Sequence, residues 1–328
     1  MLIDNHNRTI DYLRLAVTDR CNLRCNYCMP ENGINFVKSD RLLSIDELYR
    51  LSKVLVDQGI RKIRITGGEP FMRKDLMILL RKLSAIPQLE DISMTTNATL
   101  IGNHILELKE LGIKNINVSL DAINPETFNR ITRRSQFETV YGNLIKLIQE
   151  GFNVKVNFIA LDGQNTDDII PILENLTKHY PVSVRFLEEM PFNGGSKKFN
   201  EITWNHRKIF EHIASHYPSI SKISSEKTST SINYQIEDFA GTFGIIPSFT
   251  RNFCGSCNRL RITATGDVIT CLYANASKNL RDILRGESSE EKIKEEILDA
   301  IKHRAKNGFE AEKRNKNIYE NSMTSIGG

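Results

Sequence analysis

The stretch LRLAVTDRCNLRCNYC, residues 13–28, joins an alternating apolar pattern directly to three cysteines. Apolar side chains occupy every second position over residues 13–17, which is the period of a β-strand with one buried face. The cysteines follow at once, with Cys21, Cys25 and Cys28 in the spacing C-x3-C-x2-C. We therefore predict a strand whose carboxyl end runs into a loop that presents three thiols.

The same alternation recurs through residue 190, and helix-length segments separate the runs. The apolar runs lie near residues 13–17, 63–65, 92–94, 116–120, 154–158 and 182–186. An antiparallel sheet with one solvated face gives a similar alternation, but antiparallel strands need only short turns. Strands that alternate with helices favour a parallel sheet with right-handed crossovers.

The opposite face of these predicted strands is polar and basic. A closed eight-stranded barrel fills its interior with branched apolar residues, so this pattern argues against one. We predict an α/β fold, an incomplete (β/α)6 TIM-like barrel over residues 1–192, whose basic inner face suits an anionic ligand. The polar positions are Arg14, Thr18, Lys62, Arg64, Thr66, Ser93, Thr95, Asn97, Asn115, Asn117, Ser119, Asp121, Lys155, Asn157, Ser183 and Arg185.

Residues 193–328 are predicted to form a C-terminal α+β extension. We expect helices over residues 204–215 and 289–304, and a hairpin of residues 259–264 and 268–272. The polar segment 219–231 is either short strands or a loop. Three further cysteines, Cys254, Cys257 and Cys271, lie at the base and end of the hairpin.

Composition limits the classes of protein that the chain can represent. The 328 residues are 40% hydrophobic, with 44 Lys+Arg and 40 Asp+Glu, a net charge of +4. This charge is too small to indicate a nucleic-acid-binding protein, and no apolar run is long enough to span a membrane. The first twenty residues lack the pattern of a secretory signal, so we expect a cytoplasmic, reducing location.

In a reducing compartment, two cysteine triads indicate metal binding rather than disulfides. Three thiolates can hold three irons of a four-iron cluster and leave the fourth iron open, whereas such clusters normally take four. A zinc ion completed by a distant side chain is the alternative. Spacing alone leaves both alternatives open for each triad.

Two motifs resemble those of the radical S-adenosylmethionine (SAM) enzymes. The first is Cys21-x3-Cys25-x-Tyr27-Cys28, and the second is Gly67-Gly68-Glu69-Pro70 after the next predicted strand. The resemblance implies a [4Fe-4S] cluster on the first triad, whose open iron chelates SAM. It places SAM contacts on Tyr27, Gly68, Ser119 and Met190.

The second triad, the Arg259-Leu260-Arg261 segment and the terminal Gly327-Gly328 together resemble the GTP 3′,8-cyclase family of molybdenum cofactor biosynthesis. The resemblance extends over essentially the whole chain. It implies a second [4Fe-4S] cluster on Cys254, Cys257 and Cys271, with an open iron that meets the guanine base. It assigns GTP contacts to Arg14, Arg64, Thr95, Lys155, Arg259, Leu260 and Arg261, and catalytic roles to Arg185, Arg259 and Arg261.

The implied reaction converts GTP to (8S)-3′,8-cyclo-7,8-dihydroguanosine 5′-triphosphate. A 5′-deoxyadenosyl radical takes hydrogen from ribose C3′, which then adds to guanine C8. The family also implies that the Gly-Gly tail enters the active site, that the chain forms a homodimer, that an electron donor is needed, and that the product passes to cyclic pyranopterin monophosphate synthase.

Two other functions are compatible with parts of the sequence. A radical SAM peptide maturase also carries auxiliary clusters, although such proteins usually have more cysteines than one extra triad. A zinc-stabilised nucleic-acid-binding protein would use the basic segment at residues 259–261 and the basic residues after 304. Iron and sulfide content would exclude the zinc protein, and product analysis with GTP would separate the two enzymes.

Overall fold

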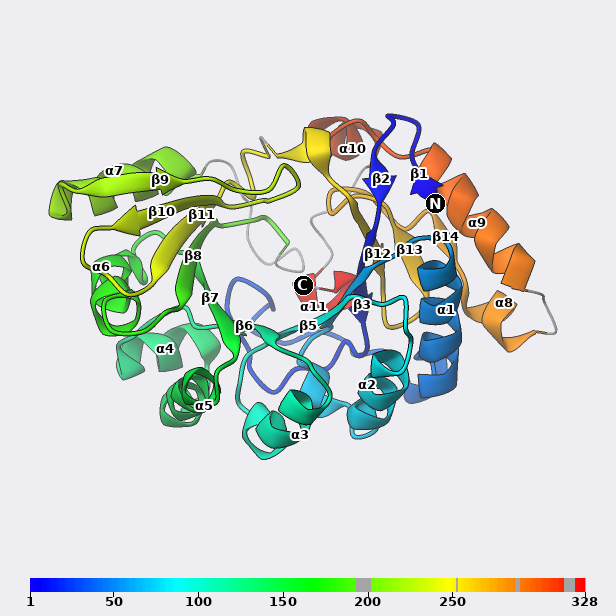
Figure 1. Ribbon diagram of the computed structural model, residues 1–328, viewed down its shortest axis with the longest axis horizontal. Helices are drawn as coiled ribbons and strands as arrows, with labels where there is room; N and C mark the ends of the chain where they lie inside the picture. The colour runs from blue at the N-terminus through cyan, green and yellow to red at the C-terminus, as the bar shows by residue number, and fades with distance from the viewer. Residues whose placement is uncertain (193–201, 252, 287–289, 316–321, 328) are drawn as a thin grey trace.

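One large curved sheet organises the chain (Figure 1). The computed structural model describes all residues except 193–201, 252, 287–289, 316–321 and 328. Within the described residues, twelve strands pair in the order β14-β13-β12-β3-β4-β5-β6-β7-β8-β11-β10-β9. Strands β1 (Leu2–Ile3) and β2 (Thr9–Ile10) form a separate hairpin. The large sheet is a partial barrel, because β14 and β9 lie at its two ends.

Six parallel strands in chain order form the middle of this sheet, as the sequence predicts. Their outward side chains are apolar and almost fully buried, with Leu13, Ile63 and Val156 each 0% exposed. Their inward side chains are polar and partly exposed, as Arg14 and Lys155 illustrate. The strands are β3 (Tyr12–Ala16), β4 (Lys62–Thr66), β5 (Asp91–Thr96), β6 (Asn115–Ser119), β7 (Asn153–Ala160) and β8 (Ser183–Glu188).

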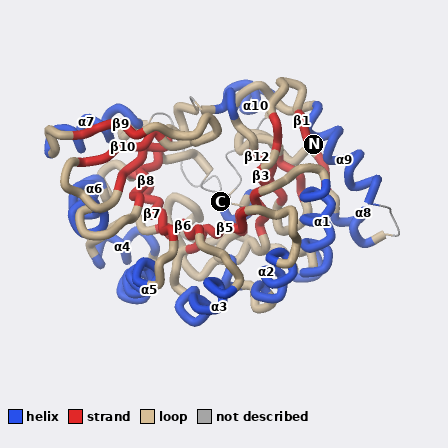
Figure 2. The backbone as a smooth tube through the Cα atoms, viewed as in Figure 1, coloured by secondary structure: helices blue, strands red, loops and turns tan. Residues whose placement is uncertain are grey.

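Helices cover the outer, apolar face of the curved sheet (Figure 2). The first begins at the predicted cap: Ser44 Oγ accepts from the Glu47 amide, and the Glu47 carboxylate accepts from the Ser44 amide. This reciprocal bonding satisfies two amides that a helix N-terminus otherwise leaves unpaired. The helices are α1 (Ile45–Asp57), α2 (Leu76–Ser84), α3 (Ile105–Glu110), α4 (Pro125–Thr132), α5 (Phe137–Gln149) and α6 (Ile169–Ile172), which continues as a π-helix over Leu173–Thr177.

The strands nearest the ends of the sheet come from the C-terminal part of the chain. Strand β11 (Thr242–Ile246) adds parallel to β8, and β12 (Arg259–Ile262) adds parallel to β3. These two strands are consecutive in sequence but lie at opposite sides of the six-stranded middle. The segment 247–258 that connects them must therefore cross the open side of the partial barrel.

The remaining elements confirm most of the coarse predictions. The predicted hairpin is β12 with β13 (Asp267–Ile269), and the two predicted helices are α7 (His206–His216) and α9 (Glu290–Lys302). The polar segment 219–231, for which the sequence allows either short strands or a loop, contains one strand, β9 (Ile220–Ile223). The other elements are β10 (Ile232–Ile236), β14 (Lys278–Asn279), α8 (Arg281–Arg285), α10 (Gly308–Arg314) and α11 (Met323–Ile326).

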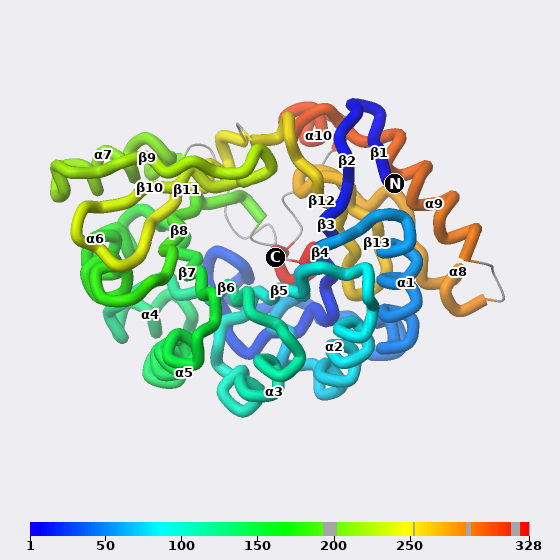
Figure 3. The backbone as a smooth tube through the Cα atoms, in the orientation of Figure 1, coloured from blue at the N-terminus to red at the C-terminus, as the bar shows by residue number. Residues whose placement is uncertain are grey.

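The C-terminal helix α11 lies inside the curve of the sheet (Figure 3), and Gly327 after it contacts Thr66 of β4. Strands from before and after residue 193 belong to the same sheet. The division of the chain into two domains, residues 1–192 and 193–328, therefore stays a prediction. Within the described part of the chain, no helix is long and apolar enough to cross a membrane.

Candidate active site

All six cysteines line one cavity of about 690 Å³ inside the curved sheet. The first triad comes from the loop after β3, at the carboxyl end of the parallel strands, where barrel enzymes collect their chemistry. The second comes from the segment that crosses the open side and from the residues after β13. Two groups that are more than 200 residues apart in sequence therefore face the same space.

The loop of the first triad is tightly folded around its cysteines. The amides of Cys28 and Met29 both donate to the Cys25 carbonyl, at 3.0 and 2.9 Å. Asn97 Nδ2 donates to Cys21 Sγ at 3.6 Å. Burial raises the pKa of Cys21 to about 11 and that of Cys28 to about 12. These thiols stay protonated until a cation binds, since metal coordination deprotonates a thiol outright.

The Gly67-Gly68 turn packs directly against the backbone that leads into this loop. A Cβ at Gly67 would lie 2.3 Å from the Thr18 carbonyl oxygen, and one at Gly68 would lie 2.3 Å from that of Arg20. Gly67 also has φ +149°, a conformation that favours glycine. The amides of Gly68 and Glu69 donate to these same two carbonyls, each at 2.8 Å. The two glycines thus set the position of Cys21 through backbone contact.

Two buried carboxyl groups brace the cavity wall beside the first triad. Glu69 accepts from the Asn97 amide at 2.7 Å and from Thr96 Oγ1 at 2.8 Å. Asp121 accepts from the Tyr27 hydroxyl at 2.7 Å and from the Ile159 amide at 2.8 Å. Burial raises the pKa of Glu69 to about 7 and that of Asp121 to about 6, against the opposing effect of these hydrogen bonds.

Cationic side chains surround the second triad. Arg304 Nη2 donates to Cys257 Sγ at 3.0 Å, and the Gly308 amide donates to Cys254 Sγ at 3.4 Å. Burial raises the pKa of Cys257, but Arg304 and Arg259 lower it by more, so its net shift is downward. Burial raises the pKa of Cys271 to about 11. The second triad therefore combines thiols of unequal acidity.

The donor set of each triad fits an iron–sulfur cluster. The chain has six cysteines, three in each triad. Three thiolates leave one iron of a four-iron cluster without a cysteine ligand. Among the described residues, no three or more His, Cys, Asp or Glu side chains converge on a point suited to a single metal ion. In an iron–sulfur cluster each cysteine thiolate binds a different iron atom, so the three sulfurs do not have to surround one point.

Basic side chains on the inner face form the cavity wall between the triads. Burial and the neighbouring arginine Arg64 lower the pKa of Arg185 to about 10, and burial with Arg259 lowers that of Arg261 to about 10. Burial, Arg185 and Arg64 lower the pKa of Lys155 to about 8. Mutual repulsion of this kind is relieved when an anion binds among the charges.

Several buried polar atoms on this face have no hydrogen-bond partner among the described residues. They are Ser93 Oγ, Thr95 Oγ1, Asn157 Oδ1 and Arg185 Nε. Buried polar atoms in folded proteins are nearly always paired, so this cluster marks a surface built to contact a polar ligand.

Sequence reasoning missed Tyr12, which lies at the centre of the basic group. Its hydroxyl accepts from Arg64 Nε, and its ring lies 5.6 Å from Lys62 Nζ and 5.7 Å from the guanidinium carbon of Arg259. Although burial acts to raise it, the charges of Arg64, Arg14 and Arg259 lower the pKa of Tyr12 to about 8. Tyr12 lies two residues before Arg14, so strand alternation places both side chains on the same face, and this pattern could have identified Tyr12 as a cavity residue.

The predicted site residues converge on the cavity with one exception. Leu260 is 1% exposed and packs in the hydrophobic core, because alternation turns it to the opposite face of β12 from Arg259 and Arg261. Its side chain therefore does not contact a ligand in the cavity. The predicted residues that line the cavity are Arg14, Cys21, Cys25, Tyr27, Cys28, Arg64, Gly68, Thr95, Ser119, Lys155, Arg185, Met190, Cys254, Cys257, Arg259, Arg261 and Cys271.

The C-terminal tail enters this cavity. Ser322 Oγ donates to the Cys28 carbonyl at 2.7 Å. The Gly327 carbonyl accepts from Arg261 Nη1 at 3.0 Å and from Thr66 Oγ1 at 3.2 Å. Gly327 has φ +77°, and a Cβ there would lie 3.0 Å from the Ala16 Cβ. Gly328 lies outside the described residues.

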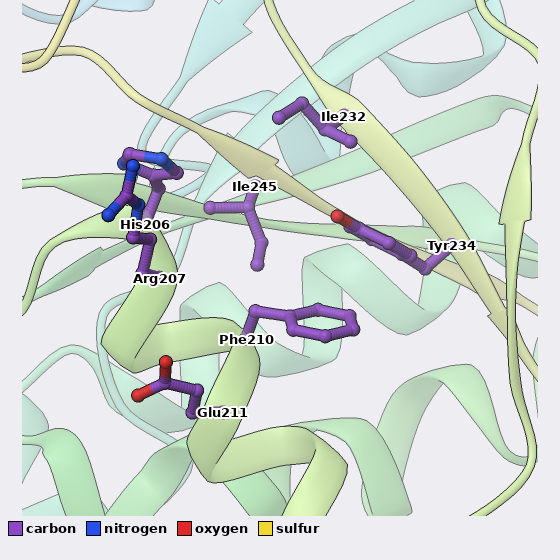
Figure 4. Close-up of a pocket in the computed structure, with 7 residues that line it drawn as sticks. All are labelled: His206, Arg207, Phe210, Glu211, Ile232, Tyr234 and Ile245. Carbon is purple, nitrogen blue, oxygen red and sulfur yellow. The ribbon is translucent and has the colours of Figure 1, made fainter.

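A second, smaller hollow of about 180 Å³ lies between α7 and the strands β10 and β11 (Figure 4). Phe210 and Tyr234 pack there with ring centroids 4.8 Å apart. The His206 ring beside it is 2.9 Å from the buried Glu188 carboxylate, which also accepts from the Thr250 amide at 2.7 Å. Through Glu188, His206 connects α7 to the segment that leads to Cys254, which gives the smaller hollow a structural role. The larger cavity is the candidate active site.

Comparison with known proteins defines the class of the chain. The sequence profile of the Radical SAM superfamily matches residues 15–176, and that of Molybdenum Cofactor Synthesis C matches residues 182–310. The structure of Streptococcus suis SuiB is similar, with a TM-score of 0.62 over 86% of this chain and 67% of that one. At 14% identity this likeness shows a shared fold only. The chain is a radical SAM protein, a class that uses SAM and an iron–sulfur cluster.

Sequence relatives define the family more narrowly. A GTP 3′,8-cyclase of Listeria welshimeri is 37% identical over 100% of this chain and 99% of its own length. The mitochondrial GTP 3′,8-cyclase of Arabidopsis thaliana is 38% identical over 93% of this chain and 78% of its own length. The chain belongs to the GTP 3′,8-cyclase family of molybdenum cofactor biosynthesis. Molybdenum cofactor biosynthesis protein 1 of Drosophila melanogaster is 39% identical over 94% of this chain. The chain spans 55% of the length of that relative.

The glycine turn gives a direct test of how the first triad is positioned. We expect Gly68→Ala to push the new Cβ into the Arg20 carbonyl, to cost about 1–3 kcal/mol and to displace the Cys21 loop. Iron content after anaerobic reconstitution should fall, because the first triad would no longer load fully. The matched control is Gly142→Ala in α5, where no atom lies within 4 Å of the added Cβ. Full iron content in the Gly68 variant would contradict this role.

Proposed function

We propose that the chain converts GTP to (8S)-3′,8-cyclo-7,8-dihydroguanosine 5′-triphosphate. Overall, ribose C3′ loses a hydrogen atom, a C3′–C8 bond forms, and the base gains one electron and one proton from an external donor and solvent. The observation that carries this proposal is the single cavity that both cysteine triads and the basic inner face line together. Family membership supports the same reaction.

The two triads divide the cofactor binding in this proposal. Cys21, Cys25 and Cys28 would hold the first [4Fe-4S] cluster with SAM, and Cys254, Cys257 and Cys271 would hold a second. When bound, SAM and its cluster would take one electron from the donor and supply methionine and a 5′-deoxyadenosyl radical, which becomes 5′-deoxyadenosine when it takes the C3′ hydrogen. Tyr27, Gly68, Ser119 and Met190 line the cavity and are the proposed SAM contacts.

The basic side chains would hold the triphosphate and orient the ribose. Arg14, Arg64, Lys155 and Arg259 would bind phosphate oxygens, because guanidinium and ammonium groups match their charge. Thr95 Oγ1 and Arg185 Nε, which lack partners among the described residues, are available for the nucleotide. Holding C3′ in one place matters, since orientation of the reacting atoms accounts for much of an enzyme's rate enhancement.

Arg261 would link the tail to the substrate. Its Nη1 donates to the Gly327 carbonyl, and both residues lie beside the wall that carries Thr66. The tail would thus hold the Arg261 guanidinium toward the cavity rather than bind GTP by itself. Arg185, Arg259 and Arg261 are the proposed catalytic charges.

The wider features of the family belong to this proposal as well. They are an incomplete (β/α)6 barrel over residues 1–192, a C-terminal extension over residues 193–328 that carries the second cluster, a homodimer, an electron donor, and transfer of the product to cyclic pyranopterin monophosphate synthase. A cytoplasmic location is proposed on the same basis.

Removing one cysteine of the second triad tests whether that triad is needed for GTP cyclisation but not for SAM cleavage. We expect Cys254→Ala to cleave SAM at close to the wild-type rate but to form no cyclised GTP, because the guanine base loses its anchor. The measurement is 5′-deoxyadenosine and cyclised nucleotide, quantified together under anaerobic conditions. Wild-type yield of the cyclised product would contradict the role of the second triad. Cys25→Ala is the matched control, and it should lose both products.

The pKa values of Lys155 and Tyr12 predict how GTP binding depends on pH. Both are about 8, so raising the pH from about 7 to about 9 removes a positive charge at Lys155 and creates a negative one at Tyr12. Each change weakens triphosphate binding, by up to about tenfold per group, since a full unit lies between the pKa and the final pH. GTP dissociation constants from anaerobic equilibrium dialysis should therefore rise over this range. Tyr12→Phe should show a smaller rise, and a pH-independent constant in the wild type would contradict the assignment.

A further inference from the structure

The N-terminal hairpin approaches the second triad through one buried carboxylate. Asp4 lies between β1 and β2, and its side chain is 0% exposed. It accepts from Arg8 Nε at 2.6 Å and from Arg304 Nη1 at 3.4 Å. A residue at the start of the chain thus joins two arginines that are almost 300 positions apart.

Each of these arginines contacts a different cysteine of the second triad. Arg8 Nη1 donates to the Cys254 carbonyl at 3.1 Å. Arg304 Nη1 donates to the Cys257 carbonyl at 3.0 Å, and its Nη2 donates to Cys257 Sγ, also at 3.0 Å. Arg8 therefore contacts only the backbone of the cysteine loop, whereas Arg304 contacts a sulfur.

In the part of the chain that the structure describes, Arg8 and Arg304 share one carboxylate partner. The side chains of Arg8 and Arg304 are 9% and 4% exposed, and both pair with Asp4. Two buried guanidiniums with one carboxylate carry an excess positive charge, and burying such a charge is unfavourable unless an anion compensates it. One N–H group of Arg304 Nη2 points at Cys257 Sγ.

We propose that Asp4, Arg8 and Arg304 form a supporting shell of the second cluster, in which Arg304 raises the reduction potential of that cluster through Cys257 Sγ. The proposal rests on the second cluster of the proposed function. Hydrogen bonds to ligand sulfurs and net charge are among the main factors that set cluster potentials. A cationic donor favours the reduced cluster, because reduction adds negative charge beside it.

Arg8 provides the matched comparison, since it shares Asp4 but does not contact sulfur. The experiment uses the full chain with Cys21, Cys25 and Cys28 replaced by alanine, so that only the second triad can load iron. Into this parent we would introduce Arg304→Met, Arg304→Lys or Arg8→Met. The readouts are iron content after anaerobic reconstitution and the midpoint potential from a redox titration followed by electron paramagnetic resonance.

We expect the parent to bind about four irons. Arg304→Met should shift the midpoint to a more negative value, and Arg304→Lys should lie between it and the parent, because lysine keeps the charge and loses the planar fork. Arg8→Met should shift the potential in the same direction but by less than Arg304→Met, because its charge acts on Cys254 without a hydrogen bond to sulfur, and it should lose iron faster to a chelator.

An unchanged potential in an iron-loaded Arg304→Met variant would overturn the proposal, as would equal shifts in the Arg8 and Arg304 variants. If Arg304→Met does not load iron, Arg304→Lys carries the measurement. Loss of iron in both Arg304 variants, with iron retained in the parent, would show a purely structural role and would also overturn it. A parent without iron would instead contradict the second cluster, so the two failures are distinguishable.

Discussion

The site depends on one topological constraint, which is that β11 and β12 add to opposite sides of the six parallel strands. The segment between them has to cross the open side of the sheet, and this crossing carries Cys254 and Cys257 to the cavity that the first triad already faces. A closed barrel would leave no opening to cross, and its interior would be filled by apolar side chains. An incomplete sheet thus provides both the space for a large substrate and the route for the second cysteine loop.

Electrostatics accounts for the second main feature, the concentration of positive charge on the inner face. Burying several arginines and a lysine together is unfavourable by itself, and the lowered pKa values of Lys155, Arg185 and Arg261 reflect this. The molecule offsets part of that cost with Tyr12 and with the Gly327 carbonyl, both of which accept from arginines. A polyphosphate would satisfy the same donors, so the cavity is arranged for a strongly anionic ligand.

Much of this arrangement could be predicted from local sequence. The six parallel strands, the capped first helix and the hairpin of β12 and β13 follow patterns of period and capping that act over a few residues. The inward positions of Arg14, Arg64, Thr95, Lys155 and Arg185 also followed from strand alternation, and the structure places all five on the cavity wall.

The parts that the sequence did not predict depend on contacts between distant segments. Strands β10 and β11 are short, and their place is decided by pairing of β11 with β8 and of β10 with β11 rather than by their own pattern. The family resemblance implies a substrate contact for the whole segment 259–261, whereas the pleat of β12 turns the Leu260 side chain into the core. The Asp4 contacts with Arg8 and Arg304 join the two ends of the chain, and no local pattern reveals them.

The central claim is that the two triads each hold a four-iron cluster around one shared cavity. The most direct measurement is the iron and sulfide content of the anaerobically reconstituted chain, compared with two variants in which one triad at a time is replaced by alanine. The account predicts about eight irons per chain for the wild type and about four for each variant. About four irons in the wild type, or stoichiometric zinc in place of iron at either triad, would contradict it.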